Sequence, residues 1–171
     1  MNIAIVGQEE HSWNHNQIPL VKSKIQSILS TSKDMTLISG HCPKGGVDIW
    51  AEEIASTHGI KKVIFKPEVN QWLDKEIIID APLSLSCKNV VTQIGYKTRN
   101  IKIAEACDIL YCIVSASRHP DCVSNAFPAN LYCKHCQVWG HPTNGGCFTL
   151  KEAKKLNKET HLIIVENVGK P

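Results

Sequence analysis

The strongest constraint on the fold is the alternation of short apolar runs with amphipathic helical patterns along the chain. Strand-like runs occur at 3–6, 35–38, 63–65, 109–114 and 162–165. Helical patterns occur at 19–29, 47–57, 98–107 and 148–156, with Gly59 as a C-cap of the second. Fully apolar strands separated by helices are typical of parallel sheets covered on both faces. The pattern predicts an α/β fold with a mainly parallel sheet.

Length and composition favour one globular domain spanning 1–171. The chain is 43% apolar and 20% charged, and its net charge of +3 permits an anionic ligand without indicating a dedicated nucleic-acid coat. Two stretches interrupt the alternation. The first, 67–98, contains Trp72 and the run 77–79, which suggest a short element, followed by loop-like residues at 82 and 84–86. The second is a Cys-, Pro- and Gly-rich insert at about 119–147, just before the last helix.

No apolar run approaches the ~18 residues of a membrane span, and the chain opens directly on a strand pattern. We therefore expect a cytoplasmic protein with no membrane partner. The eight cysteines are unevenly distributed, and four of them crowd into 26 residues of the second insert. Without a secretory signal, such a cluster favours metal binding over a disulfide framework.

Glycine-rich segments fall where ligands bind parallel sheets, beside the carboxyl ends of strands. Gly7 follows the first strand, the loop 40–48 follows the second, and Gly145-Gly146 precedes the last helix. Cations that can neutralise phosphate stand nearby at Lys44, Lys97 and Arg99, and Thr98 can cap its helix and offer a hydroxyl. Neither G-x-x-x-x-G-K-[ST] nor G-x-G-x-x-G is present. The placement predicts a phosphate-binding cleft of a non-standard kind.

Carboxylates near this edge leave an enzymatic alternative open. Glu9 lies where a general base could sit, whereas Glu52 and Glu53, one turn into the second helix, are interpreted as solvated helix carboxylates. In an enzyme, Glu9, Asp48 or Glu52 would act on the ribose side of a nucleotide.

Four segments carry a resemblance to a known family, and the first is the opening strand that ends in Val6-Gly7. The chain reads SGHCPKGGVDIWAEEIA at 39–55, GYKTRNIKIAEACDIL at 95–110 and GGCFTLKEAKKLNKETHLIIV at 145–165. These resemble the SGGAxGVDxxAExxA, GxxxRNxxIAExAD and GGTxxTxxxAxKxxxPVxxV patterns of the SLOG superfamily. That superfamily includes the DNA-processing protein A and the cytokinin-activating phosphoribohydrolases (the LOG enzymes). Within it, the small stand-alone YspA-related group is the most similar.

The resemblance implies a Rossmann-like three-layer sandwich with a mainly parallel sheet, and a nucleotide-derived ligand. It assigns the phosphate- or ribose-contacting loop to Gly40, Gly45, Gly46, Val47 and Asp48. It assigns a second contact to Arg99 and Asn100, and it lines the same cleft with Gly7, Gly145 and Gly146. The run His41-Cys42-Pro43-Lys44-Gly45 is longer than the usual Gly-Ala-x-Gly. The PGGxGTxxE loop of the phosphoribohydrolases, with its catalytic glutamate, is absent, which favours recognition over turnover.

The insert carries a metal-binding pattern, Cys133-x2-Cys136-x4-His141-x5-Cys147. Three thiolates and an imidazole at this spacing suit a tetrahedral structural zinc site, with Cys122 and His135 as spare candidates. The pattern differs by one residue from the RNA-binding knuckle C-x2-C-x4-H-x4-C, and Tyr132, Lys134 and Trp139 could supply stacking and charge. Because the last ligand adjoins the closing helix, a structural clip across the cleft mouth is the preferred interpretation.

Three functions remain in order of preference. The first is a module that senses or sequesters a nucleotide-derived small molecule, such as an ADP-ribose-type or cyclic nucleotide ligand. The second is a nucleoside or nucleotide N-glycosidase, and the third is single-stranded nucleic-acid binding. Related SLOG domains commonly pair, so the resemblance also implies a homo-oligomer.

Overall fold

The computed structural model describes residues 1–32, 34–69, 71–72, 77–80, 90–93, 95–116 and 132–166. The described strands are β1 (Asn2–Gly7), β2 (Thr36–Ser39), β3 (Lys61–Ile64), β4 (Ile77–Asp80), β5 (Val90–Gln93), β6 (Ile109–Ser115), β7 (Tyr132–Cys133), β8 (Val138–Trp139) and β9 (Glu159–Val165). The helices are α1 (Gln17–Leu29), α2 (Val47–Thr57), α3 (Tyr96–Ala106) and α4 (Gly145–Lys155), with a short 3-10 turn at Glu10–Ser12.

Five strands form one parallel sheet in the order β3-β2-β1-β6-β9. The chain winds outward from β1 to β3, crosses back, and then winds from β6 to β9. The order therefore reverses between β1 and β6, and a crevice opens beside their carboxyl ends at this point in such folds.

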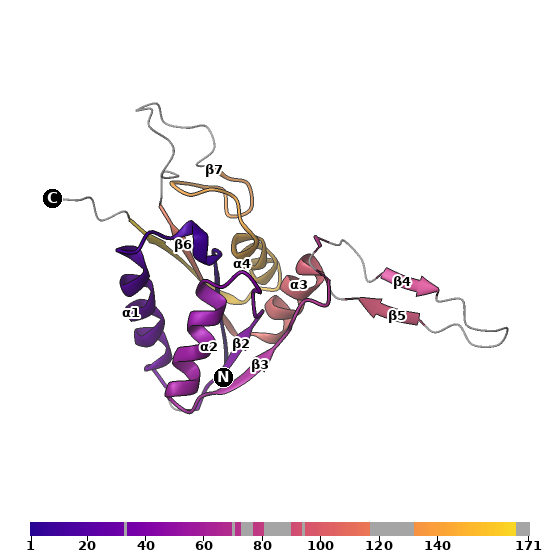
Figure 1. The fold of residues 1–171 in the computed structure, drawn as a ribbon, viewed down its shortest axis with the longest axis horizontal. Coiled ribbons are helices and arrows are strands. Elements are labelled where there is room, and N and C mark those ends of the chain that lie inside the picture. Colours follow the sequence, from indigo (N-terminus) through magenta and orange to yellow (C-terminus); the bar gives the residue numbers. More distant parts are fainter. Residues whose placement is uncertain are drawn as a thin grey trace.

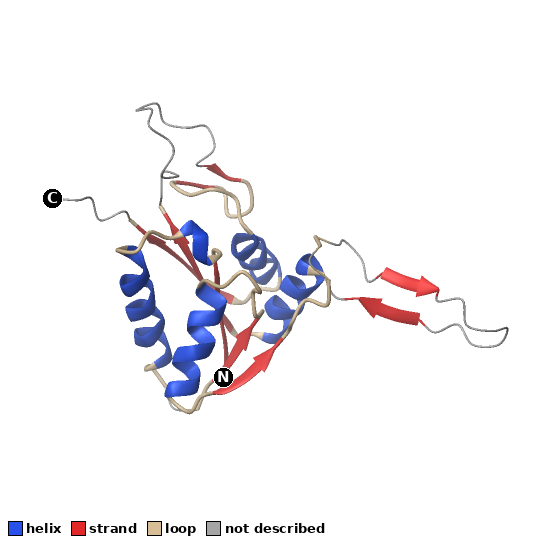
Figure 2. Cartoon of the chain, viewed as in Figure 1, coloured by secondary structure: helices blue, strands red, loops and turns tan. Residues whose placement is uncertain are grey.

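Helices cover both faces of the sheet, as Figures 1 and 2 show. Alternate residues of β1 divide the core: Ile3 and Ile5 pack with α1 and α2, and Ala4 and Val6 pack with α3 and α4. The pleat sends successive side chains to opposite faces, so a continuous apolar strand supplies both cores. The predicted Rossmann-like three-layer sandwich is confirmed.

Three helices begin two or three residues earlier than their apolar patterns predict, at Gln17, Tyr96 and Gly145. Their first turns carry polar residues or glycine, so hydrophobic periodicity does not mark them. The predicted C-cap at Gly59 is one residue late, since the C-cap is His58. Gly59 follows it in the left-handed conformation, with φ +69°, and Ile60 N–H donates to the Ala55 carbonyl at 2.9 Å, so the glycine still ends the helix.

Two small antiparallel hairpins interrupt the alternation. β4 and β5 pair in the first interruption, so the element suggested at 77–79 is a strand, while 81–89 lie outside the described residues. β7 and β8 pair within the predicted insert, whose residues 119–131, including Cys122, also lie outside them. No helix of the described chain has the length and apolarity that crossing a membrane requires.

Candidate functional site

A cavity of about 340 Å³ lies at the carboxyl ends of β1 and β2, beside the boundary between β1 and β6 where the sheet order reverses. Its walls come from the β1 loop, the start of α2, the first turn of α3 and the segment entering α4. The lining residues are Val6, Gly7, Gln8, Glu9, Ser12, Cys42, Asp48, Trp72, Tyr96, Arg99, Asn100, Pro142, Thr143, Asn144, Gly145, Gly146 and Thr149. This volume falls in the range of small-molecule sites.

The N-terminus of α4 forms one wall of the cavity. Asn144 is the N-cap, and its side-chain oxygen accepts the Cys147 amide at 3.0 Å. The amides of the first helical turn have no partner within the helix, and the helix dipole places partial positive charge at this end. A Cβ on Gly146 would lie 2.9–3.1 Å from the backbone of Gly7, so α4 and β1 meet main chain to main chain. Only glycine permits this approach.

Arg99 crosses from α3 to the loop after β2. Its Nη1 donates to the Gly40 carbonyl at 2.8 Å and lies 3.7 Å from Oδ2 of Asp48, while Nε donates to Asn100 at 3.1 Å. The side chain is buried and lines the cavity. Within the described chain its hydrogen bonds use Nε and Nη1, which leaves Nη2 for a ligand. Asn100 in turn donates to the Gly145 carbonyl at 3.3 Å, so Arg99 and Asn100 connect the α2 and α4 sides.

Asp48 is a buried carboxyl in the cavity wall, in the first turn of α2. Burial and, to a lesser extent, the nearby Glu52 raise its pKa to about 6, against the opposing effect of the Arg99 guanidinium. A carboxyl with this pKa can hold or release a proton near neutral pH, and it can accept hydrogen bonds from ribose hydroxyls when ionised.

Two aromatic side chains that the sequence interpretation missed also line the cavity. Trp72 is half exposed, and its ring meets Phe148 edge-on with centroids 5.1 Å apart. The Tyr96 ring lies under the Arg99 guanidinium at 5.3 Å. Trp72 belongs to a stretch without periodicity, so no local pattern connects it with α4.

Six of the twelve predicted ligand residues line the cavity: Gly7, Asp48, Arg99, Asn100, Gly145 and Gly146. The other six, Gly40, Lys44, Gly45, Gly46, Val47 and Thr98, are not among the lining residues. For these six, ligand contact stays a prediction.

Three of those six, Gly46, Val47 and Thr98, contact or position residues of the cavity lining without lining the cavity themselves. Gly46, with φ +93°, would bring a Cβ 2.3 Å from the Gln8 carbonyl oxygen, and Val47 N–H donates to the same oxygen at 3.2 Å. The glycines of this loop thus let the chain pack against the β1 loop. Thr98 hydrogen-bonds through its hydroxyl to the Gly95 amide at 2.9 Å, so it caps α3.

Lys44 and Glu9 pair across the loops, with Nζ and Oε1 3.2 Å apart. The lysine is exposed, and the ion pair raises its pKa. Lys44 therefore balances the charge of Glu9 at the cavity rim in this structure.

The interpretation of Glu52 as a solvated carboxylate is wrong. Glu52 is buried, accepts from the Ser39 hydroxyl at 2.6 Å and contacts Nδ1 of His41 at 2.8 Å. Glu53 behaves as expected, being exposed and 3.7 Å from Lys22. The difference arises because Glu52 faces the sheet, where the end of β2 supplies its partners.

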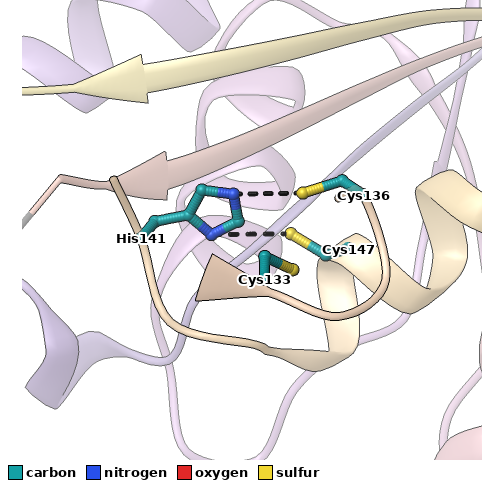
Figure 3. A group of neighbouring side chains, drawn as sticks. All are labelled: Cys133, Cys136, His141 and Cys147. Carbon is teal, nitrogen blue, oxygen red and sulfur yellow. Dashed lines mark hydrogen bonds between the residues drawn. The ribbon is translucent and has the colours of Figure 1, made fainter. Parts of the chain in front are cut away.

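The four predicted metal ligands come together, as Figure 3 shows. One ligand atom from each of Cys133, Cys136, His141 and Cys147 lies within 4.8 Å of all the others. Tetrahedral zinc–thiolate and zinc–imidazole bonds place ligand atoms about 3.6–3.8 Å apart, which this group can reach by small side-chain shifts. His135 is not part of the group, since its ring packs on Phe148.

The chemistry of the cluster suits a cation. Nδ1 of His141 lies 3.0 Å from the Pro142 carbonyl oxygen, which fixes the tautomer and turns the free Nε2 toward Cys136 Sγ at 3.1 Å. Burial lowers the pKa of His141 and keeps it neutral. Burial, with the Cys133 and Cys147 thiols, raises the pKa of Cys136 to about 12. A divalent cation would supply the charge that the thiolates need.

Comparison with protein-family models, curated proteins and solved structures found no match for this chain. The functional assignment therefore depends on the residues and geometry described above.

Proposed function

We propose that this protein binds a nucleotide-derived small molecule, of the ADP-ribose or cyclic nucleotide type, in the cavity beside β1. One observation carries the proposal: the N-terminus of α4, the Arg99 guanidinium and the Asp48 carboxyl line a single cavity at the point where the sheet order reverses. Membership of the SLOG superfamily and the homo-oligomer that it implies are part of the same proposal.

Each part of a nucleotide has a suitable partner in the cavity. Phosphate suits the Gly145 and Gly146 amides at the start of α4 and Nη2 of Arg99, because the helix end carries partial positive charge and the guanidinium is a cation. Ribose hydroxyls suit the Asp48 carboxylate. A base suits the ring of Trp72 or Tyr96, since aromatic faces stack on any nucleobase.

A thermal-shift series tests the proposal. The zinc-loaded protein is titrated with ADP-ribose, NAD, AMP and cyclic dinucleotides, and a ligand at 100 times its Kd stabilises the fold by about 2.7 kcal/mol. Gly145→Val should abolish the shift, because a side chain there points toward Asn100 and Trp72. Lys22→Gln, an exposed control on α1 that pairs with Glu53, should retain it. If no member of the panel shifts Tm, the proposal fails.

A second candidate, a nucleotide N-glycosidase, is favoured by the pKa of about 6 at the buried Asp48 carboxyl. Such a group can act as a general acid or base at neutral pH. Release of free base from the same panel, followed by chromatography, would show turnover, and Asp48→Asn should then abolish release while binding persists. Intact ligand after prolonged incubation would leave binding alone.

We also propose that the ion at the Cys3His cluster is zinc and that it is structural. Thiolates and imidazole are the ligands that zinc prefers, and four protein ligands leave no open position for substrate. Metal analysis of the purified protein should give one zinc per chain. A stoichiometric amount of another metal, or none, would contradict this.

A further inference from the structure

The segment between two of the metal ligands is itself a wall of the cavity. Residues 142–146 all line the cavity, and they are bracketed directly by His141 and Cys147. An ion bound by both flanking residues would therefore close a short loop whose inner face meets the ligand.

The N-terminal half of this wall is held by the metal hairpin, which we define as residues 132–141. The Thr143 hydroxyl accepts the Lys134 amide at 2.9 Å, and the Pro142 carbonyl faces His141 Nδ1 at 3.0 Å. In the described chain, the hydrogen bonds of Pro142 and Thr143 go to this hairpin or to Asn144. The conformation of this half thus depends on the hairpin.

The C-terminal half is held by the sandwich. Gly146 packs on Gly7, and the Gly145 carbonyl accepts from Asn100. Cys147 lies beneath, buried, with its Sγ 3.8 Å from Cys112 of β6. Residues 142–146 therefore run from the sandwich to a hairpin that packs on the sandwich through Cys133 and His135. A cation bound by Cys133, Cys136, His141 and Cys147 would join the two ends of this segment directly.

We propose that the metal ion is a positioning element of the ligand cavity, so that metal and nucleotide-derived ligand bind with positive coupling. This inference rests on the proposed function. The ion holds His141 beside Cys147 and so fixes residues 142–144 against the α4 N-terminus. Because coupling between two sites is reciprocal, each ligand strengthens the binding of the other by the same factor.

The first test needs no nucleotide. Amide NMR spectra of the zinc-loaded and chelator-treated protein are compared at 143–146 and, as an internal control, along α1. The wall resonances should shift or broaden on zinc removal while those of α1 keep their positions. Unchanged resonances of residues 143–146 would overturn the inference. Collapse of the whole spectrum would also overturn it, because it would show that the metal stabilises the entire fold and not this segment in particular.

The second test measures the coupling with ADP-ribose as the probe. Its Kd should rise at least tenfold on zinc removal, and saturating ADP-ribose should lower the Kd of zinc, measured by chelator competition, by the same factor. A blank without protein corrects for zinc bound by ADP-ribose itself. Equal affinity of the zinc-loaded and zinc-free forms would overturn the coupling and leave the proposed function intact.

If the wall responds to zinc but the zinc-loaded protein binds none of the nucleotide panel, the proposed function fails and the positioning of residues 142–144 stands. The variant Cys136→Ser removes one metal ligand without the use of a chelator. Cys136 is chosen because it is only half buried, whereas the other three ligands are buried. Cys107→Ala is the matched control, a buried thiol outside both the cluster and the cavity lining. Only Cys136→Ser should reproduce the effect of zinc removal.

Discussion

At the scale of single residues, Asp48 and Glu52 show how position decides the behaviour of a carboxyl group. Both lie on α2 and both are buried, but Glu52 has the Ser39 hydroxyl and the His41 ring as partners. Asp48 faces the cavity with Arg99 at 3.7 Å, and burial outweighs this attraction, so its pKa is raised to about 6. Ionised Asp48 is therefore a cost to the folded state, and a group that costs stability in a cavity is a functional candidate.

Asp48→Asn should stabilise the protein at pH 8 but not at pH 4. A raised pKa means that the folded state binds the proton more tightly than the unfolded state, so stability falls as pH rises from about 4 to about 6. Asn mimics the protonated form and removes this loss, worth up to about 3 kcal/mol at a pKa of about 6. Urea unfolding of both proteins at the two pH values isolates the contribution. A pH-independent difference would contradict it.

At the scale of elements, the start of α4 combines two different glycines. Gly146 is in contact with the backbone of Gly7, whereas a Cβ on Gly145 would meet only side-chain atoms, at 3.4 Å and 3.8 Å. The first glycine joins helix to sheet, and the second leaves space for the cavity. The sequence Gly145-Gly146 does not reveal this difference, because it depends on which atoms lie opposite each glycine in the folded structure.

Gly146→Ala should destabilise the protein by about 1–3 kcal/mol, the usual cost of forcing an extra carbon into a packed contact. Gly145→Ala should change stability by less than about 0.5 kcal/mol, as substitutions outside packed contacts do. Chemical unfolding at neutral pH, in buffer with excess zinc, measures both. Equal effects of the two alanines would show that α4 does not pack on β1 in the way described.

At the scale of the whole molecule, the metal cluster links a small hairpin to the sandwich. Cys133 lies in β7 of the hairpin and Cys147 lies in α4, and both are buried in the core that α3, α4 and β6 share. A metal ion bound there would contribute to the free energy of folding, because the four ligands are near one another only in the native state.

The free energy of unfolding should rise by about 1.4 kcal/mol for each tenfold increase in free zinc above its Kd. Urea unfolding in zinc buffers measures the slope, and magnesium buffers serve as the control because magnesium avoids thiolate ligands. A free energy of unfolding that does not change with free zinc would show that metal binding at the cluster does not stabilise the fold. An equal response to magnesium would show an unspecific effect of divalent ions.

Much of the fold could be predicted because short stretches of the sequence carry the pattern of each strand and helix. Residues 3–6 and 109–114 are apolar throughout, and the pattern of 47–57 has a helical period, so each segment states its own structure and burial. The metal ligands were predictable for the same reason, since four of them fall within 15 residues. The predicted first residues of the helices were less accurate. Glycine and polar residues at a helix start cap the helix and do not pack in the core, so they add nothing to the hydrophobic pattern.

The amino-acid sequence was enough to predict the five strands of the parallel sheet, the four helices between them and the members of the metal cluster. Which loop residues line the cavity became clear from the folded chain, in which Arg99 contacts Gly40, Gly146 packs on Gly7, Glu52 is buried and Trp72 lines the cavity. The physical reason is the range of the interactions involved. Periodicity and ligand spacing act within a few turns of chain, whereas a cavity wall is set by packing between segments up to about 140 residues apart, which no local pattern encodes.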